Sequence, residues 1–202
     1  MQRLLLLLFI SITALSCGKS DNDSEPEKYK IVINHALAKT FDANLFLVNF
    51  SYTEREKMEK AIEVIKLVVA TEEFRERVLN YTYNGQKSFV DNNGWSNEEI
   101  YQIILDGAET LQPARNNTMD AEIELYYANT NVIGYTYPSS TRIWINTKYF
   151  NSYSPAGVAH NLFHEWMHKQ GFNHASSWSP SRDHSVPYAL GFIIGEIGQD
   201  FL

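Results

Sequence analysis

Three histidines near the C-terminus constrain the fold of this chain more than any other feature. His164 and His168 are four residues apart, so a helix would place them one turn apart on one face. Gly171 stands where a left-handed residue commonly ends a helix, and His174 follows three residues later. The spacing therefore predicts a helix that begins at Ser154-Pro155 and ends near Gly171, and a loop that returns His174 to the same face.

The residue types in this segment are those of a catalytic zinc site. Three imidazole nitrogens can bind one Zn²⁺ ion at about 2.0–2.1 Å and leave the fourth tetrahedral position open. Glu165 follows the first histidine, so its carboxylate can act as general base toward a water at the open position. We therefore expect His164, His168 and His174 to hold one zinc ion, with Glu165 as the catalytic base. The competing interpretation is that the histidines stabilise a helix end through its dipole.

Residues 164–174 read His-Glu-x-x-His-x-x-Gly-x-x-His and resemble the zinc-binding signature of the metzincin clan of metallopeptidases, which includes astacins and matrix metallopeptidases. The resemblance implies an α+β zincin fold, with a twisted mixed sheet and the active-site helix in an N-terminal lobe, and a small C-terminal lobe. It also implies zinc-dependent hydrolysis of peptide bonds, with endopeptidase activity. In that clan an edge strand pairs with the substrate backbone. Residues 133–137, with Gly134, Tyr135 and Thr136 at their centre, hold the matching position.

The sequence departs from the clan at its methionine turn. No methionine follows Met167, and Ser185 to Tyr188 resembles an astacin-type turn with Pro187 in place of the methionine. The resemblance then implies that Tyr188 stabilises the tetrahedral oxyanion, and the competing interpretation is a packed aromatic residue. Asp183 is a candidate for orienting a ligand imidazole. We therefore expect a divergent, metzincin-like branch.

The first 28 residues predict export and a lipid anchor. Residues 1–16 have a basic start and then an apolar run that is too short to cross a bilayer, as in a secretory signal peptide. The run ends in Ala14-Leu15-Ser16 before Cys17, which resembles a bacterial lipobox and makes Cys17 the expected lipidation site. An ordinary signal peptide is the alternative. Residues 17–28 are polar and acidic and predict a flexible tether, which leaves residues 29–202 as the catalytic domain.

The remaining pattern predicts helices, then strands, then the helix that bears the histidines. Helical spacing begins at Thr53, at Thr71 and at Ser96, and the apolar stripe of the third helix includes Leu111. Strands are expected at 29–33, 45–50, 121–128, 133–137 and 141–146. Alternation in 121–128 places Tyr127 on the inward face. This order of elements is typical of an α+β domain.

Charge narrows the class of partner. The formal net charge is -7, and an acidic surface argues against nucleic acid as the main partner, because phosphate binding needs a basic stripe. We expect a monomer in a bacterial cell envelope, at the outer membrane or cell surface, that is held by its lipid and acts on a protein or peptide. Two other functions stay open: a zinc-containing binding lipoprotein without turnover on a metallopeptidase scaffold, and hydrolysis of a non-protein amide of the envelope.

Overall fold

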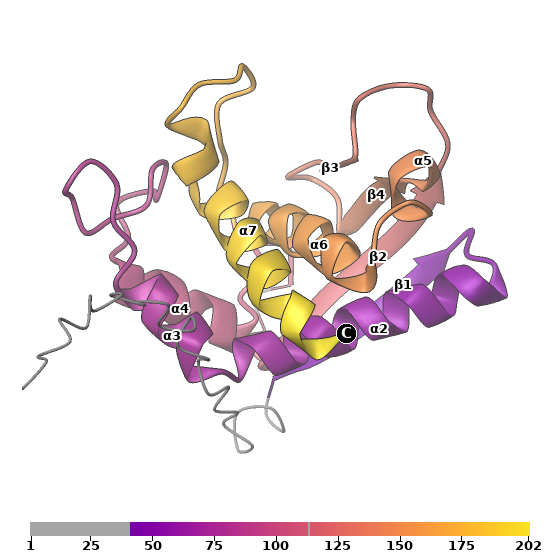
Figure 1. The fold of residues 1–202 in the computed structure, drawn as a ribbon, viewed down its shortest axis with the longest axis horizontal. Helices are drawn as coiled ribbons and strands as arrows, with labels where there is room; N and C mark the ends of the chain where they lie inside the picture. The colour runs from indigo at the N-terminus through magenta and orange to yellow at the C-terminus, as the bar shows by residue number, and fades with distance from the viewer. Residues whose placement is uncertain (1–40, 113) are drawn as a thin grey trace, which may run out of the picture. The chain divides into compact units, whose positions relative to one another are not determined.

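A computed structural model describes residues 41–112 and 114–202. The predicted signal peptide, the lipidation site Cys17, the acidic tether and the strand expected at 29–33 lie outside the described residues. Within the described ranges, no helix combines the length and the apolar character needed to cross a membrane. The fold is α+β, as predicted, with one mixed sheet and a set of helices (Figure 1).

The sheet has the strand order β1-β2-β4-β3. β1 is parallel to β2 and β2 is parallel to β4, whereas β3 runs antiparallel to β4. The strands are β1 (Asp42–Val48), β2 (Thr118–Tyr126), β3 (Gly134–Thr136) and β4 (Arg142–Asn146). β3 therefore lies at an edge of the sheet, as predicted for residues 133–137, and its outer side pairs with no other strand among residues 41–112 and 114–202.

Hydroxyl side chains cap the helices that lie between β1 and β2. Ser51 and Ser96 each form a capping box with a glutamate three residues later, and Thr71 caps the helix that follows it. The first of these helices begins just after Ser51, slightly earlier than the start predicted at Thr53. The α-helices are α2 (Tyr52–Val69), α3 (Glu72–Leu79), α4 (Asn97–Asp106), α5 (Thr147–Phe150), α6 (Pro155–Lys169) and α7 (Val186–Gly198), and the 3-10 helices are η1 (Arg182–His184) and η2 (Gln199–Phe201).

Two residues that were predicted to face inward lie in solvent. α4 ends at Asp106 because Gly107 adopts a φ of 60°, and a Cβ on Gly107 would collide with the backbone of Thr118. Leu111 lies beyond this end and is 46% exposed. Tyr127 follows the last residue of β2 and is 73% exposed. Both predictions are wrong because each extended a periodic pattern past the point where its element ends.

The helix α7 has no counterpart among the predicted elements. Most of its residues are buried, so it lacks the polar face by which an amphipathic helix is found in a sequence. Ser185 to Tyr188, predicted to be a turn, form the N-cap and first turn of this helix. Gly191 and Gly195 of α7 lie against His160 of α6, where a Cβ on Gly191 would stand 2.9 Å from the imidazole and a Cβ on Gly195 would stand 3.0 Å from the His160 Cβ. The two helices can therefore pack closely.

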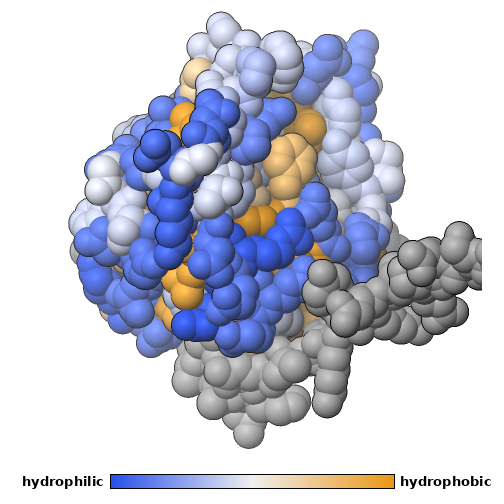
Figure 2. Space-filling view, turned by 60° about the vertical axis from the view of Figure 1, so that its left-hand side comes forward, coloured by the Kyte–Doolittle hydropathy of each residue, from blue (hydrophilic) through white to orange (hydrophobic). Residues whose placement is uncertain are grey.

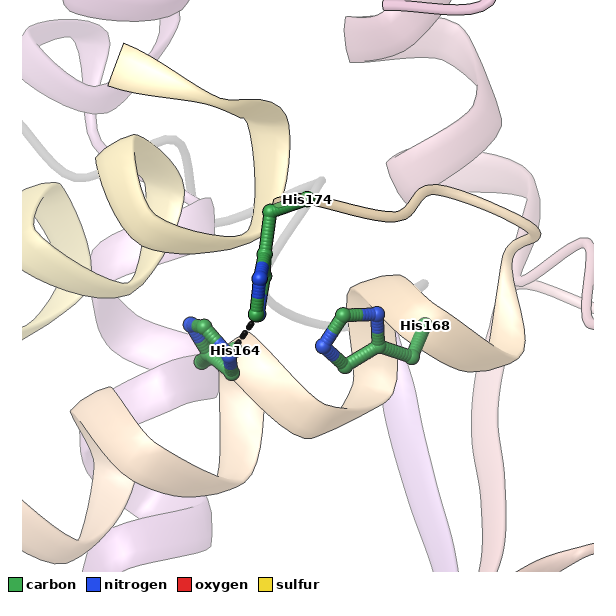
Figure 3. Close-up of side chains that lie close together, drawn as sticks. All are labelled: His164, His168 and His174. Carbon is green, nitrogen blue, oxygen red and sulfur yellow. Dashed lines mark hydrogen bonds between the residues drawn. The ribbon is translucent and has the colours of Figure 1, made fainter. Parts of the chain in front are cut away.

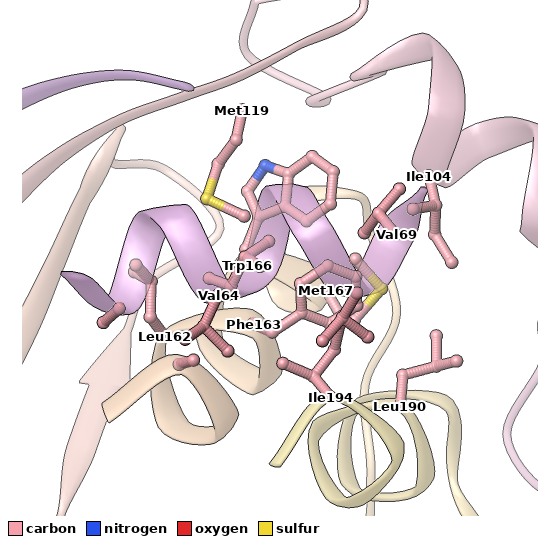
Figure 4. Close-up of a cluster of buried hydrophobic side chains, with 14 of the residues drawn as sticks. Val64, Val69, Ile104, Met119, Leu162, Phe163, Trp166, Met167, Leu190 and Ile194 are labelled. Atoms are coloured by element: carbon pink, nitrogen blue, oxygen red, sulfur yellow. The ribbon is translucent and has the colours of Figure 1, made fainter. Parts of the chain in front are cut away.

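The core lies behind the segment that carries the first two histidines. Phe163, Trp166 and Met167 of α6 are fully buried, together with Leu190 and Ile194 of α7 (Figure 4). The Trp166 and Phe163 rings meet edge to face with their centroids 5.3 Å apart. Full burial of one large apolar side chain contributes about 1.5–3 kcal/mol. The back of α6 is therefore held firmly, and this fixes the direction in which its front side chains point.

On the face drawn in Figure 2, hydrophobic residues show in the hollows of a mainly hydrophilic surface.

Candidate metal centre

The helix α6 begins and ends where the sequence predicts. Ser154 caps its start, accepting a hydrogen bond from the Gly157 amide at 3.2 Å. At the other end, Gly171 has a φ of 91°, and its amide donates to the His168 carbonyl oxygen at 3.1 Å. The Phe172 amide donates to the Met167 carbonyl oxygen at 3.1 Å. This pair of bonds is a Schellman motif, which reverses the chain and directs residues 172–174 back over the helix.

The reversal brings His174 to the two histidines of α6 (Figure 3). One nitrogen from each of His164, His168 and His174 lies within 4.8 Å of the other two. His164 Nε2 and His174 Nε2 are 3.2 Å apart. Two nitrogens that each lie about 2.0–2.1 Å from one tetrahedral ion would be separated by roughly 3.3 Å. The three-histidine group predicted from the sequence is therefore confirmed, and its spacing fits a single metal ion.

Backbone carbonyls set the tautomers of two of these imidazoles. His168 Nδ1 lies 2.8 Å from the Phe172 carbonyl oxygen, and His174 Nδ1 lies 3.0 Å from that of Ala175. A carbonyl oxygen can only accept, so each Nδ1 carries the proton and each Nε2 keeps its lone pair. Such partners orient metal-binding imidazoles. We expected Asp183 to serve this purpose, and that prediction is wrong for His168 and His174, because carbonyl oxygens occupy the position.

Burial keeps the cluster neutral. Burial lowers the pKa of His164 well below its ordinary value of 6.5, and the neighbouring imidazoles lower it further. Burial likewise lowers the pKa of His168 to about 4 and lowers that of His174. Only a neutral imidazole offers a lone pair to a metal, so the donor set is in its binding form at neutral pH. The alternative role, in which charged histidines stabilise a helix end, loses its basis because these side chains are not charged there.

Glu165 lies on the side of α6 that faces β3. Its side chain is 4% exposed, and burial raises its pKa to about 8, an effect that the Lys169 ammonium opposes. A Cβ on Gly134 would stand 3.1 Å from Glu165 Oε1 and 2.9 Å from Asn161 Oδ1. Gly134 is therefore the residue that lets the edge strand approach this carboxylate.

A cleft of about 750 Å³ lies in front of the cluster. The predicted edge-strand residues Gly134, Tyr135 and Thr136 line it, together with the three histidines and Glu165. Tyr188 lines it as well, with its ring centroid 4.4 Å from that of His164 and 4.6 Å from that of His174. Every residue that the sequence analysis assigned to the metal, the base or the oxyanion therefore borders one cavity, together with the three central residues of the edge strand.

Two further residues of the cleft escape sequence reasoning. Asn161 has a buried side-chain oxygen with no hydrogen-bond partner among the described residues, and it lies one helical turn before Glu165. That spacing of four residues was the signal that could have identified it. Arg182 places its guanidinium 4.5 Å from the centroid of the Tyr188 ring. No spacing in the sequence indicates this contact, because it depends on how η1 packs against α7.

The other two described histidines take structural positions. His160 lies one helical turn before His164, and its ring meets that of Phe192 edge to face, with 4.8 Å between the centroids. His184 Nδ1 lies 2.7 Å from the Tyr81 hydroxyl, and its ring lies against that of Tyr83.

Comparison of the whole chain with protein-family models and with curated proteins finds no match. Its function must therefore be argued from the site itself.

Proposed function

We propose that this chain is a zinc-dependent metallopeptidase that hydrolyses peptide bonds, on a divergent metzincin-like fold. One observation carries the proposal: three neutral imidazoles converge on one point at the wall of a cleft, and a buried carboxylate follows the first of them in the chain. A site that only bound a metal for structure would have no use for the carboxylate or for an open cleft.

His164, His168 and His174 would hold the zinc ion through their free nitrogens. When bound, the ion supplies Lewis acidity, which favours loss of a proton from water and polarises a carbonyl group. Three protein ligands leave room for a further ligand from the cleft, as the chemistry requires.

Glu165 acts as the general base and then as the acid. Its carboxylate takes up the proton of the attacking water and passes it to the nitrogen of the leaving amine. In the metal-free protein burial raises the pKa of this group to about 8, and a raised pKa makes the carboxylate a stronger base. The Lys169 ammonium lowers the same pKa and favours the ionised form.

The strand β3 would bind and align the substrate. Its outer edge is free of other described strands, and Gly134, Tyr135 and Thr136 line the cleft. An extended peptide can add to such an edge through backbone hydrogen bonds that do not depend on side-chain identity. The Gly134 backbone lies beside Glu165, so a peptide on this edge would lie near the base.

Tyr188 would donate its hydroxyl hydrogen bond to the developing oxyanion. Its position against His164 and His174 supports this assignment. The Tyr188→Phe variant should lose roughly tenfold to a thousandfold in kcat and change KM little. Unchanged kcat would leave Tyr188 as a packing residue.

The test of the proposed function is hydrolysis by Glu165→Gln. The wild-type protein should cleave a peptide library, and a chelator should prevent this cleavage. The Glu165→Gln variant should bind as much zinc as the wild-type protein, while its kcat falls by about 10²–10⁴-fold. Glu63→Gln, the same change at an exposed position of α2, is the matched control and should cleave normally. Full activity of Glu165→Gln would refute the assignment, and absence of any cleavage by the wild-type protein would favour a binding lipoprotein.

We further propose that the protein is exported to a bacterial cell envelope. The support is the sequence of residues 1–16, the lipobox-like residues before Cys17 and the polar tether at 17–28. The proposal predicts that cells incorporate labelled fatty acid into the protein and not into Cys17→Ser. Equal labelling of both proteins would contradict it.

A further inference from the structure

Arg182 carries a positive charge that no carboxylate of the described residues neutralises. Its Nε is buried and has no hydrogen-bond partner, and its guanidinium forms no ion pair within the described part of the chain. The other described arginines are either bound to carboxylates or exposed on α2; they are Arg75, Arg77, Arg115 and Arg142 in the first group and Arg55 in the second. A half-buried cation without a partner is costly, which points to a partner that comes from outside.

This cation lies close to the metal centre. The Arg182 guanidinium stacks over the Tyr188 ring at 4.5 Å, and that ring lies against both His164 and His174. One aromatic ring therefore separates the guanidinium from two of the three imidazoles. The cation–π contact also limits the orientations that the guanidinium can adopt.

The charge within the cleft is asymmetric. Among the described residues that line it, Arg182 is the one permanent cation and Glu165 is the one carboxylate. Glu165 faces Gly134 of β3, whereas Arg182 stacks on Tyr188 of α7. An anionic group that enters the cleft would therefore be drawn toward the wall formed by η1 and α7.

We infer that Arg182 determines substrate specificity by binding a carboxylate that lies within one or two residues of the bond to be cleaved. The planar guanidinium matches a carboxylate with two parallel hydrogen bonds. Either an acidic side chain or the free C-terminus of a short peptide supplies this group. The inference rests on the proposed function, because it assumes that peptides bind in this cleft.

Four peptides of one parent sequence separate these sources. One has Glu and one has Gln next to the cleaved bond, and each is made with a free and with an amidated C-terminus. The readout is the ratio of kcat/KM for a carboxylate-bearing peptide to that for its neutral partner. For the wild-type protein we expect a ratio of roughly ten or more. A gain from Glu identifies a side-chain carboxylate, and a gain from the free C-terminus identifies a terminal one.

In Arg182→Gln the ratio should fall to about one. Arg182→Lys should keep part of the preference for the carboxylate peptide, because lysine retains the charge but lacks the planar pair of donors. Arg55→Gln removes the same charge from an exposed position of α2 and should keep the wild-type ratio. Equal losses on charged and neutral peptides in Arg182→Gln would overturn the inference, since they would indicate a role in catalysis or packing. A wild-type ratio near one would overturn it too.

A binding measurement keeps this inference separate from the proposed function. Zinc-loaded Glu165→Gln should bind the preferred carboxylate peptide about tenfold or more tightly than its amide partner, and adding Arg182→Gln should abolish the difference. If the wild-type protein cleaves no peptide but this difference in Kd is present, the proposed function fails and the role of Arg182 stands. Equal Kd values, or no binding of either peptide, would refute the role of Arg182.

Discussion

Gly134 of β3 and Glu165 of α6 are in such close contact that no side chain fits between them. A Cβ on Gly134 would stand 3.1 Å from Glu165 Oε1, 2.9 Å from Asn161 Oδ1 and 3.2 Å from the Trp144 carbonyl oxygen. The φ of Gly134 is not positive, so glycine is needed here for space and not for backbone conformation. The edge of the sheet and the Glu165 carboxylate are thus positioned by one another.

Gly134→Ala should therefore impair catalysis more than folding. The added methyl group must displace the Glu165 carboxylate, the Asn161 amide or the strand, and a displacement of about 1 Å costs on the order of a hundredfold in rate. We expect kcat/KM to fall by that amount while the zinc content stays at the wild-type level. Wild-type kcat/KM in this variant would show that the contact does not position the base.

Lys169 ties the end of α6 to the turn between β3 and β4. Its buried ammonium donates to the carbonyl oxygens of Tyr137 and Ser140, the first at 3.2 Å. Lys169→Met keeps the length of the side chain and leaves both carbonyls without this donor, so the free energy of unfolding should fall by about 1–3 kcal/mol.

The same change should raise KM for peptides, because the turn that it frees belongs to the proposed substrate strand. Lys87→Met, which removes an exposed ion pair with Glu98, is the control and should change the free energy of unfolding by less than about 1 kcal/mol. Urea denaturation measures both variants. If Lys169→Met matched the control in stability and in KM, the hydrogen bonds from Lys169 to the turn would contribute neither to folding nor to peptide binding.

Glu109 makes the stability of the metal-free protein depend on pH. Its carboxylate accepts from the Trp166 indole and, at 3.0 Å, from the Asp120 amide, and burial raises its pKa from 4.5 to about 7. The folded protein thus holds this proton more tightly than the unfolded chain does. The contribution is full below pH 4.5 and is lost as the pH rises through about 7.

Glu109→Gln should remove this dependence. Between pH 4.5 and 7, the free energy of unfolding of the metal-free variant should decline less than that of the wild-type protein, because the amide does not titrate. Denaturant titrations at the two pH values provide the comparison, and Glu63→Gln should keep the wild-type slope. A steeper decline in Glu109→Gln would contradict the raised pKa.

The sequence predicted the site well where local geometry determines it. The separation of His164 and His168 by one helical turn, the cap at Ser154 and the left-handed Gly171 each follow from short-range rules. The convergence of His174 follows from them, because the Schellman motif sends the chain back. The edge position of β3 was also predicted, from the place of residues 133–137 before the helix that bears the histidines.

The parts that were missed depend on contacts between distant segments. α7 is buried on most sides, so its sequence has no helical alternation to detect. The contact of Arg182 with Tyr188 depends on how η1 packs against α7. The contact of Gly134 with Glu165 depends on β3 lying beside α6. Spacing within one segment contains no information about such pairs.

The most direct test of the central claim is the zinc content of the purified protein and of two histidine variants. The wild-type protein should bind one zinc ion per chain, and His174→Ala should bind it on the order of a hundredfold or more weakly, since it loses a ligand. His184→Ala, which removes the imidazole that contacts Tyr81, should keep the wild-type affinity. A wild-type protein that binds no zinc, or a His174→Ala variant that binds it as tightly as the wild type, would contradict the account.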